Sequence, residues 1–460
     1  MKKLFGTDGI RGKAGEFPLD TATVRVIGRS LAQHLAENSE RSPQIVIGRD
    51  TRESGPWIER ALIAGAHEAG AQVKSAGVIT TPGVAFLTRT LAVDAGVVIS
   101  ASHNPYYDNG IKVFKPSGRK LDDAVERQIE ADIANSEASA KGNDDDASET
   151  MSSADAAKLQ SFYAEYLTKE VAGDLSLANL NIVMDCANGA AYQIAPEVFR
   201  RLGANVIAIN DRPDGHNINL NCGSLHIEAL QKQVTAHRAD LGVAFDGDAD
   251  RALFVDEAGD FVDGDATLWI LANDFKARGE LNGNTVVATV MSNIGLELAF
   301  RAQGTNLTRT DVGDKYVLEE VLRSGAALGG EQSGHIIFPR VSLAGDGIIT
   351  TIMLLRAMRQ REQPLSELTR VFQRYPQLLV NVPVRERRPF EDLPSVQDTV
   401  REIGESLDGR GRLLLRYSGT EPLARIMIEG EDERQIANYA QKLADQIRQE
   451  IGVTQPGDES

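Results

Sequence analysis

The sequence has little of what a secreted or membrane-bound protein needs. Its 460 residues include only two cysteines, Cys186 and Cys222, which are too few for a disulfide framework and indicate a reducing compartment. No apolar run approaches the roughly 18 residues that span a bilayer. Lys2 and Lys3 are not followed by an apolar stretch, so no signal peptide is expected. These absences predict a cytoplasmic protein that does not bind membranes.

An excess of basic residues is also missing. The chain has 49 lysines and arginines against 66 aspartates and glutamates, for a formal net charge of −17. Binding to a nucleic-acid backbone requires a basic face, so no nucleic-acid partner is expected. Arginines that bind an anionic substrate would have to be focused locally, against an unfavourable overall field.

One local pattern occurs three times: a helix that ends in glycine, then a small residue and a short apolar strand. The glycines are Gly70, Gly203 and Gly304, and an earlier apolar strand precedes each copy, at 45–47, 182–184 and 286–288. A glycine there fits the left-handed residue that often ends a helix. Strand, helix and strand in this order predict an α/β domain, and the three copies predict duplication.

The predicted fold class is α/β, with three related α/β domains that have mixed sheets and a C-terminal α+β domain. A single core stops growing at roughly 250–300 residues, so several domains are expected. Residues 253–262 predict a hairpin and residues 431–450 a helix. The expected domains are residues 1–134, 156–256, 257–373 and 374–460, with a linker or insertion at 135–155.

Ser102 lies where an apolar strand runs into a short polar turn, in the segment 98–105. His103 and Lys112 add groups for proton transfer or positive charge, and Pro105 would stiffen the turn. Such a serine is more often a turn or capping residue than a nucleophile. No Gly-x-Ser-x-Gly elbow surrounds it, which disfavours acyl transfer.

Asp246, Asp248 and Asp250 follow the apolar run 241–245 at alternate positions. In an extended chain this alternation places three carboxylates on one side. They tolerate one another only around a cation, and oxygen ligands favour Mg²⁺ or Ca²⁺. An EF-hand is rejected, because its sixth position needs a glycine where this chain has Arg251. Ser102 beside such a site predicts phosphoryl transfer, with Arg251 near the carboxylates or the phosphate.

Two further loops offer ligand-binding groups. In the loop 329–335, Glu331 and Ser333 offer an acceptor and a donor to sugar hydroxyls, and His335 is either structural or catalytic. The loop 416–422 resembles a phosphate cradle, because arginines and hydroxyls donate and glycine lets backbone amides approach an anion. An ordinary hairpin turn is its alternative. The candidate phosphate-binding residues are Arg416, Ser418, Gly419, Thr420 and Arg425.

With these motifs in order, the chain resembles the α-D-phosphohexomutases. Five segments carry the resemblance: 6–12, 100–112, 246–251, 330–335 and 416–422. It implies the four-domain phosphohexomutase fold around a central cleft. It also implies that Ser102 is a phosphoserine, maintained or primed by a hexosamine or hexose 1,6-bisphosphate. The three aspartates and this phosphate would hold Mg²⁺, while Arg11, Lys112 and Arg251 would line the reaction centre.

The resemblance also implies a substrate, a small phosphosugar. Gln332 resembles the residue that is usual at this position in one branch of the family. Members of that branch interconvert glucosamine 6-phosphate and glucosamine 1-phosphate through the 1,6-bisphosphate. A phosphoglucomutase or phosphomannomutase is the alternative. The chain is expected to be a monomer or a homodimer. Three residues depart from common family patterns: Ala249 for glycine, Tyr417 for proline and Asp314 for histidine. The last departure leaves the proton-transfer groups open.

Two other classes of protein compete with a mutase. In a metal-dependent phosphatase, water would take the phosphoryl group from Ser102. Two-metal phosphatases of this kind usually need more histidine and carboxylate ligands, and this chain has only seven histidines, which disfavours that class. A non-catalytic phosphosugar sensor needs neither Ser102 nor the three aspartates.

Overall fold

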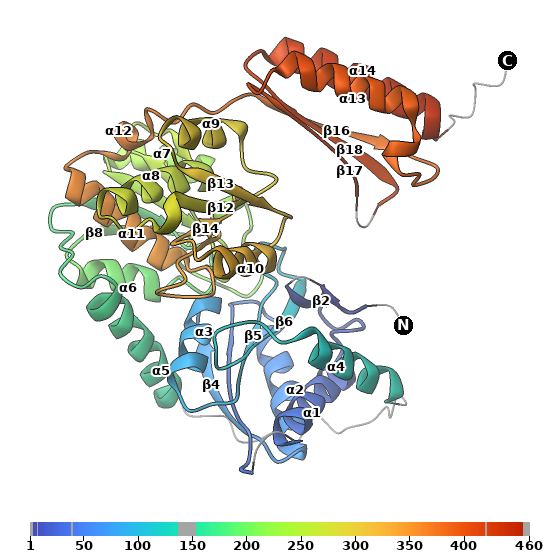
Figure 1. Cartoon of the computed structure of the whole chain (residues 1–460). Coiled ribbons are helices and arrows are strands. Elements are labelled where there is room, and N and C mark those ends of the chain that lie inside the picture. The colour runs from blue at the N-terminus through green and yellow to red at the C-terminus, as the bar shows by residue number, and fades with distance from the viewer. Residues whose placement is uncertain (1–2, 7, 38–39, 137–152, 419–420, 454–460) are drawn as a thin grey trace. The chain divides into compact units, whose positions relative to one another are not determined.

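A computed structural model describes the chain except for residues 1–2, 7, 38–39, 137–152, 419–420 and 454–460. It divides into two compact units, Met1–Val290 with Thr308–Arg370, and Met291–Leu307 with Val371–Ser460. Mixed α/β sheets and their helices make up the first unit (Figure 1). No helix among the described residues is long and apolar enough to cross a membrane.

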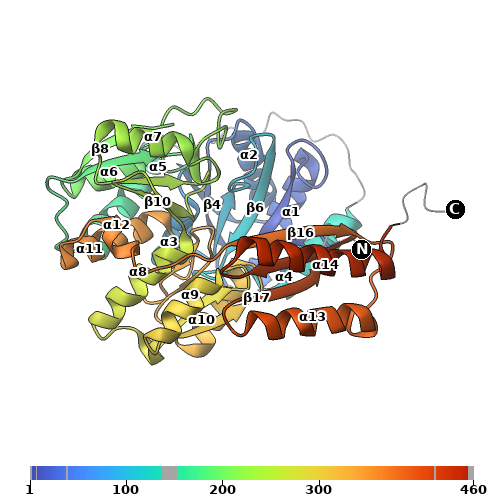
Figure 2. The same cartoon turned by 90° about the horizontal axis from the view of Figure 1, so that it is seen from above.

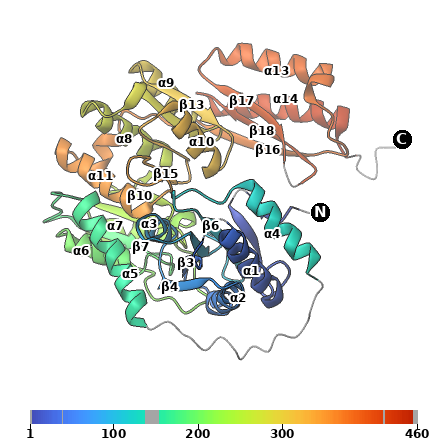
Figure 3. The same cartoon turned by 60° about the horizontal axis from the view of Figure 1, so that its bottom comes forward.

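The first sheet has the strand order β1-β2-β6-β5-β3-β4. Its strands are β1 (Phe5–Gly6), β2 (Gly9–Lys13), β3 (Gln44–Arg49), β4 (Gln72–Val78), β5 (Ala95–Ile99) and β6 (Asp108–Phe114). Strands β4, β3 and β5 are parallel, and β6 is antiparallel to β5. Helices cover both faces, so β5 is buried along its whole length. Helices α1 (Thr21–Glu37), α2 (Gly55–Glu68) and α4 (Asp123–Asn135) lie on one side and α3 (Thr81–Thr90) on the other (Figures 1 and 3).

The next two sheets repeat this plan. The second has the order β11-β10-β9-β7-β8 and the third β13-β12-β14-β15. Their strands are β7 (Asn181–Asp185), β8 (Asn205–Ile209), β9 (Leu241–Phe245), β10 (Ala252–Asp256), β11 (Phe261–Val262), β12 (Thr285–Thr289), β13 (Asn306–Thr310), β14 (Gly329–Gly330) and β15 (Ile336–Ile337). In all three sheets the first strand of the repeat lies between the second and the third, and the fourth runs antiparallel beside the third. The predicted triplication is confirmed, as is the hairpin formed by β10 and β11.

This common order gives three loops the same place in their sheets. Each loop joins the third strand of a repeat to the fourth: β5 to β6, β9 to β10, and β14 to β15. These loops contain Ser102, the three aspartates, and Glu331 with Ser333 and His335. The predicted left-handed glycines also occur, with φ of +79° at Gly70, +98° at Gly203 and +69° at Gly304.

Helices complete the first unit; in Figure 2, α6 and α7 lie beside the second sheet. Those not yet named are α5 (Ser153–Glu165), a π-helical continuation (Tyr166–Val171), α6 (Ile194–Arg201), α7 (Glu228–His237), α8 (Gly264–Ala277), α10 (Asp314–Ser324), α11 (Gly347–Arg361) and α12 (Leu365–Thr369). The insertion expected at 135–155 lies mostly outside the described residues. The predicted domain boundaries stay predictions.

The second unit has an antiparallel sheet of different design, which confirms the predicted α+β ending. Its strands β16 (Gln377–Pro383), β18 (Leu423–Glu429) and β17 (Arg412–Tyr417) lie in that order. Helices α13 (Pro394–Leu407) and α14 (Glu433–Ile451) bury their apolar side chains against the sheet. Helix α14 confirms the helix predicted at 431–450. The unit also contains α9 (Ile294–Ala302).

Candidate active site

Ser102 joins the first loop to the second. It is 1% exposed, and its φ of +53° is left-handed, which is unusual for a residue with a side chain. Its hydroxyl donates to Oδ2 of Asp246 at 2.6 Å and lies 3.3 Å from Nδ1 of His103. The backbones of the two loops also approach closely, because a Cβ at Gly247 would lie 2.5 Å from the carbonyl oxygen of Ser102. The predicted phosphorylation site and the predicted metal loop are therefore in direct contact.

A buried arginine holds the conformation of the serine loop. Arg52 is 1% exposed and donates to Oδ2 of Asp50 at 2.8 Å. Its guanidinium also donates to four backbone carbonyls of the loop, those of Ser102, Asn104, Pro105 and Asp108. Asn219 adds bonds to the carbonyls of Ser102 and Asn104, at 2.9 and 3.0 Å. These bonds offset the cost of the left-handed backbone at Ser102.

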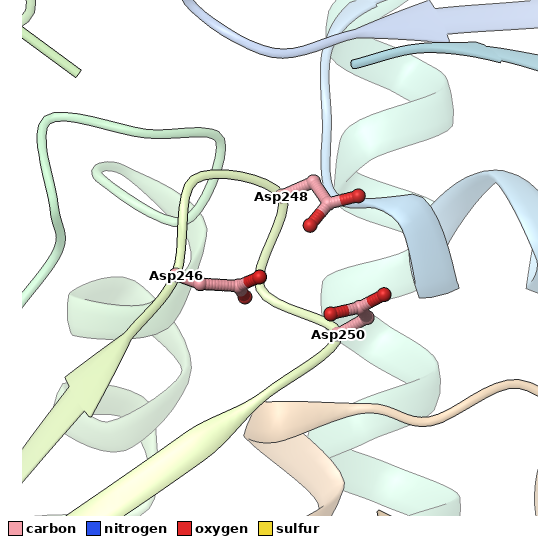
Figure 4. Close-up of side chains that lie close together, drawn as sticks. All are labelled: Asp246, Asp248 and Asp250. Carbon is pink, nitrogen blue, oxygen red and sulfur yellow. The ribbon is translucent and has the colours of Figure 1, made fainter. Parts of the chain in front are cut away.

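The three aspartates converge in the second loop (Figure 4). Asp246, Asp248 and Asp250 are buried, and each offers a carboxylate oxygen within 4.8 Å of the others. The expectation of an extended chain is wrong, because residues 247–248 form a turn, residues 249–250 form a bend and Ala249 has a left-handed φ of +56°. The carboxylates meet because the loop folds back on itself. Strand alternation does not bring them together.

The chemistry of this group fits a divalent cation. Oδ1 of Asp248 and Oδ1 of Asp250 are buried without a hydrogen-bond partner. Burial, with the charges of Asp250 and Asp248, raises the pKa of Asp246 well above its usual range. Three buried carboxylates, two of them with an unsatisfied oxygen, are costly unless a cation lies among them, and hard oxygen donors suit Mg²⁺.

Lys112 supplies a buried positive charge to the same place. It projects from β6 with 1% exposure, and its ammonium nitrogen lies 2.9 Å from Oδ2 of Asp248 and 2.9 Å from Oδ2 of Asp8. Burial alone would lower the pKa of Lys112, but the carboxylates of Asp248, Asp8 and Asp250 raise it well above normal. The hydroxyl of Thr81, at the start of α3, donates to Asp248 at 2.6 Å. Arg11 is paired with Asp8.

The third loop places His335 and Glu331 beside these groups. His335 is 5% exposed, and its Nδ1 lies 3.6 Å from Oδ2 of Asp250. Burial lowers the pKa of His335, but its contact with Asp250 and the charge of that carboxylate raise it to about 9. Oε1 of Glu331 accepts from the backbone amide of Gly313 at 3.0 Å, and Ser333 donates to Oε2 at 3.5 Å. Arg251 lies 3.9 Å from Asp250.

His103 follows Ser102 and differs from His335 in its charge. Burial lowers the pKa of His103 to about 4, helped by the positive charges of Arg251 and Arg11. Its ring is therefore neutral at pH 7 and able to accept or donate a proton near Ser102. His335 is a cation at the same pH.

The predicted phosphate loop belongs to the second unit. Arg416 on β17 and Arg425 on β18 are direct partners across the antiparallel pair. Arg425 donates to Oε2 of Glu421 at 3.0 Å, but its Nε is buried without a hydrogen-bond partner. Ser418 is 1% exposed and accepts from the amide of Glu421 at 3.3 Å. Gly419 and Thr420 lie outside the described residues.

Sequence reasoning did not single out several side chains that build the site. Asp8 lies in the glycine-rich opening segment, but only its contacts with Lys112 and Arg11 reveal a role. Arg52 follows a strand end like any surface arginine. The side chains missed are Asp8, Asp50, Arg52, Thr81, Lys120 and Asn219.

Comparison with known families finds matches along most of the chain. Four descriptions of the phosphoglucomutase/phosphomannomutase family match the chain: alpha/beta/alpha domain I at residues 2–140, domain II at 161–259, domain III at 263–375 and the C-terminal domain at 379–446. The chain therefore belongs to the phosphoglucomutase/phosphomannomutase family, whose members are phosphohexomutases.

More specific likeness comes from individual relatives. A protein from Solibacter usitatus named phosphoglucosamine mutase is 51% identical over 451 residues, which cover 98% of this chain and 99% of that protein. A protein of the same name from Syntrophotalea carbinolica is 48% identical and covers 98% of each chain.

Solved structures confirm the fold. A phosphoglucomutase/phosphomannomutase family protein from Burkholderia thailandensis superposes with a TM-score of 0.78 at 22% identity, covering 98% of this chain and 100% of that one. An Aspergillus fumigatus N-acetylphosphoglucosamine mutase, solved with GlcNAc-6P and magnesium, gives a TM-score of 0.66 at 18% identity, covering 97% and 95%.

Proposed function

We propose that this protein is a phosphoglucosamine mutase, which interconverts glucosamine 6-phosphate and glucosamine 1-phosphate. The single observation that carries the proposal is the buried hydroxyl of Ser102, hydrogen-bonded at 2.6 Å to a carboxylate of the acidic loop. A serine in contact with a hard-cation site is suited to carry a phosphoryl group. The relatives near 50% identity support glucosamine as the sugar of the substrate, since they are named phosphoglucosamine mutase.

In the proposed reaction, phosphorylated Ser102 transfers its phosphoryl group to the hydroxyl at C1 of glucosamine 6-phosphate. The Ser102 Oγ–P bond breaks as the bond from O1 to phosphorus forms, and the proton of the C1 hydroxyl is transferred to the released serine oxygen, which gives glucosamine 1,6-bisphosphate. The bisphosphate turns round, and its 6-phosphate returns to Ser102. A hexosamine or hexose 1,6-bisphosphate also primes the serine at the start.

Asp246, Asp248 and Asp250, with the phosphate on Ser102, would hold Mg²⁺. The ion would offset the charge of the transferring phosphoryl group. Lys112 and Arg11 would help to neutralise the same group. Arg251 would bind the phosphoryl oxygens.

Proton transfer is the role that we assign to a histidine of this site. His335, a buried cation at pH 7, would donate toward the leaving oxygen in one direction and accept in the other. This role is the catalytic alternative for His335, and its contact with Asp250 holds the ring in place.

The sugar and its second phosphate require separate binding groups. Glu331 and Ser333 would bind sugar hydroxyls from the third loop. Arg416, Ser418, Gly419, Thr420 and Arg425 would hold whichever phosphate is not reacting. Water would have to be excluded from the site, because it would otherwise hydrolyse the phosphoserine.

One set of rates tests the proposal. We would measure kcat/KM for glucosamine 6-phosphate, glucose 6-phosphate and mannose 6-phosphate on one Mg²⁺-loaded, Ser102-phosphorylated preparation, and assay free phosphate in parallel. We expect a clear preference for the amino sugar and negligible phosphate release. A preference for glucose or mannose would assign the protein to the alternative phosphoglucomutase or phosphomannomutase activity. Stoichiometric phosphate release would instead identify a phosphatase.

A further inference from the structure

A row of alternating charges runs from the acidic loop to the start of α10. Lys112 shares its ammonium group between Asp248 and Asp8, at 2.9 Å each. The other oxygen of Asp8 lies 2.5 Å from Nζ of Lys120, which lies 2.6 Å from Oδ2 of Asp314. Asp314 and Asp248 thus mark the two ends of a row in which each charge touches the next.

The far end of this row also fixes the third loop. Asp314 is the first residue of α10, and the amide of the preceding Gly313 donates to Oε1 of Glu331 at 3.0 Å. Gly313 has a φ of +135°, which side-chain-bearing residues rarely adopt. Two adjacent residues therefore bind Lys120 with a carboxylate and Glu331 with an amide.

We propose that Lys120 is a positioning residue that couples Lys112 to the sugar-binding Glu331. Through Asp8 it sets where the ammonium group of Lys112 lies, and through Asp314 it fixes the segment that orients Glu331. The inference rests on the proposed function, because Lys112 and Glu331 are assigned their roles there.

Geometry and burial favour positioning over a surface ion pair. The Lys120 side chain is 22% exposed, and those of Asp8 and Asp314 are 23% and 21% exposed. The negative charges of Asp314 and Asp8 raise the pKa of Lys120 although burial opposes them. Asp8, Lys112, Lys120 and Asp314 also line one cavity of about 370 Å³. The network thus reaches space that is open to a ligand.

The chain provides a matched control. Lys315 pairs with Asp123 at 2.7 Å, and this pair joins α10 to α4 just beside the Lys120 network. Its side chains are 38% and 53% exposed, and no bond links it to Asp8. If Lys120 only held these elements together, losing Lys315 would have a similar effect on activity.

The test compares Lys120→Met with Lys315→Met in the full-length, Mg²⁺-loaded enzyme. We expect Lys120→Met to lower kcat at least tenfold and Lys120→Arg to restore part of it, because the charge is kept. Lys315→Met should leave kcat within twofold. Equal losses in the two methionine variants, or a kcat for Lys120→Met within twofold of wild type, would overturn the inference.

A double-mutant cycle separates positioning from stability. If Lys120 positions Glu331, the loss in kcat/KM of the double variant Lys120→Met/Glu331→Gln should be at least fivefold smaller than the product of the two single losses. The same cycle with Lys315→Met should be multiplicative. Multiplicative losses in both cycles would contradict the coupling.

The proposed function can fail separately. Wild-type rates decide the sugar substrate, whereas ratios of variant to wild type decide the role of Lys120. Should no hexose phosphate be a substrate, the same variants are compared by the loss of phosphate from phospho-Ser102 to water, followed by intact mass. Lys120→Met is then expected to slow this loss at least threefold and Lys315→Met to leave it unchanged. Equal rates would reject the inference.

Discussion

The serine loop and the phosphate loop, each taken within its own unit, differ in where their arginines find partners. Arg52 is buried and donates to one carboxylate and four carbonyls of the segment that it holds. Arg416 and Arg425 instead face each other across β17 and β18, and Nε of Arg425 is buried without a partner. The protein's own groups complete the first loop, whereas the second keeps a buried donor, Nε of Arg425, that an anion would satisfy.

This difference suits two kinds of task. A group that exchanges a phosphoryl with either end of a sugar must stand in one place, because small displacements cost much rate. A cradle that accepts two different phosphates in turn gains from donors that are not already committed. The serine loop therefore has fixed geometry, and the phosphate loop has available charge.

Ser102→Ala should have the largest effect on activity. Removing the phosphoryl carrier is expected to lower kcat by roughly 10⁴-fold or more. The fold should persist, because the change removes one hydrogen bond to Asp246, worth about 1 kcal/mol. Mutase rates and urea unfolding would measure the two quantities. Substantial residual mutase activity would rule out Ser102 as the carrier.

Arg52→Met should have the largest effect on stability. It leaves Asp50 buried without its charge partner and deprives four loop carbonyls of a donor. Breaking such a buried pair costs about 3–5 kcal/mol in the free energy of unfolding. Arg60→Met, at an exposed position of α2, is the control and should stay within about 0.5 kcal/mol. Similar unfolding midpoints for the two variants would refute the interpretation that the bonds of Arg52 hold the serine loop in place.

Arg425→Met should show the opposite balance. We expect KM for glucosamine 6-phosphate to rise about 10- to 100-fold, because a charge-assisted bond to phosphate is worth roughly 1.5–3 kcal/mol. Stability should change by less than about 1 kcal/mol, since the Glu421 pair is partly exposed. Arg434→Met, at an exposed position of α14, controls for the loss of a positive charge in the same unit. An unchanged KM in Arg425→Met would remove this residue from the cradle.

Local sequence patterns predicted the strands and the repeats of this molecule, but they did not predict its long-range contacts. Apolar runs and glycine positions gave the strands and the three related domains, and the run of aspartates after β9 gave the carboxylate group. Local periodicity failed for the shape of that loop, because turns and the left-handed Ala249 override alternation. It could not find Lys120, whose partner Asp314 is 194 residues away. Only the folded chain shows that such ordinary charged residues lie together and are mostly shielded from solvent.

The smallest prediction concerns two left-handed residues in the loops of the site, Ser102 at φ +53° and Ala249 at φ +56°. The serine cannot be exchanged without losing its hydroxyl, but the alanine can. Ala249→Gly relieves roughly 1–2 kcal/mol of backbone strain and loses about 0.5–1 kcal/mol through the more flexible unfolded chain. The net change is expected to be a gain of up to about 1.5 kcal/mol in unfolding free energy, with kcat/KM within twofold.

Ala272→Gly, inside α8, is the matched control for this change. There the backbone is helical, so the same substitution should destabilise the protein by about 1 kcal/mol. Urea unfolding of both variants measures the difference in sign. If both lose stability equally, the left-handed turn at Ala249 carries no strain that the substitution relieves.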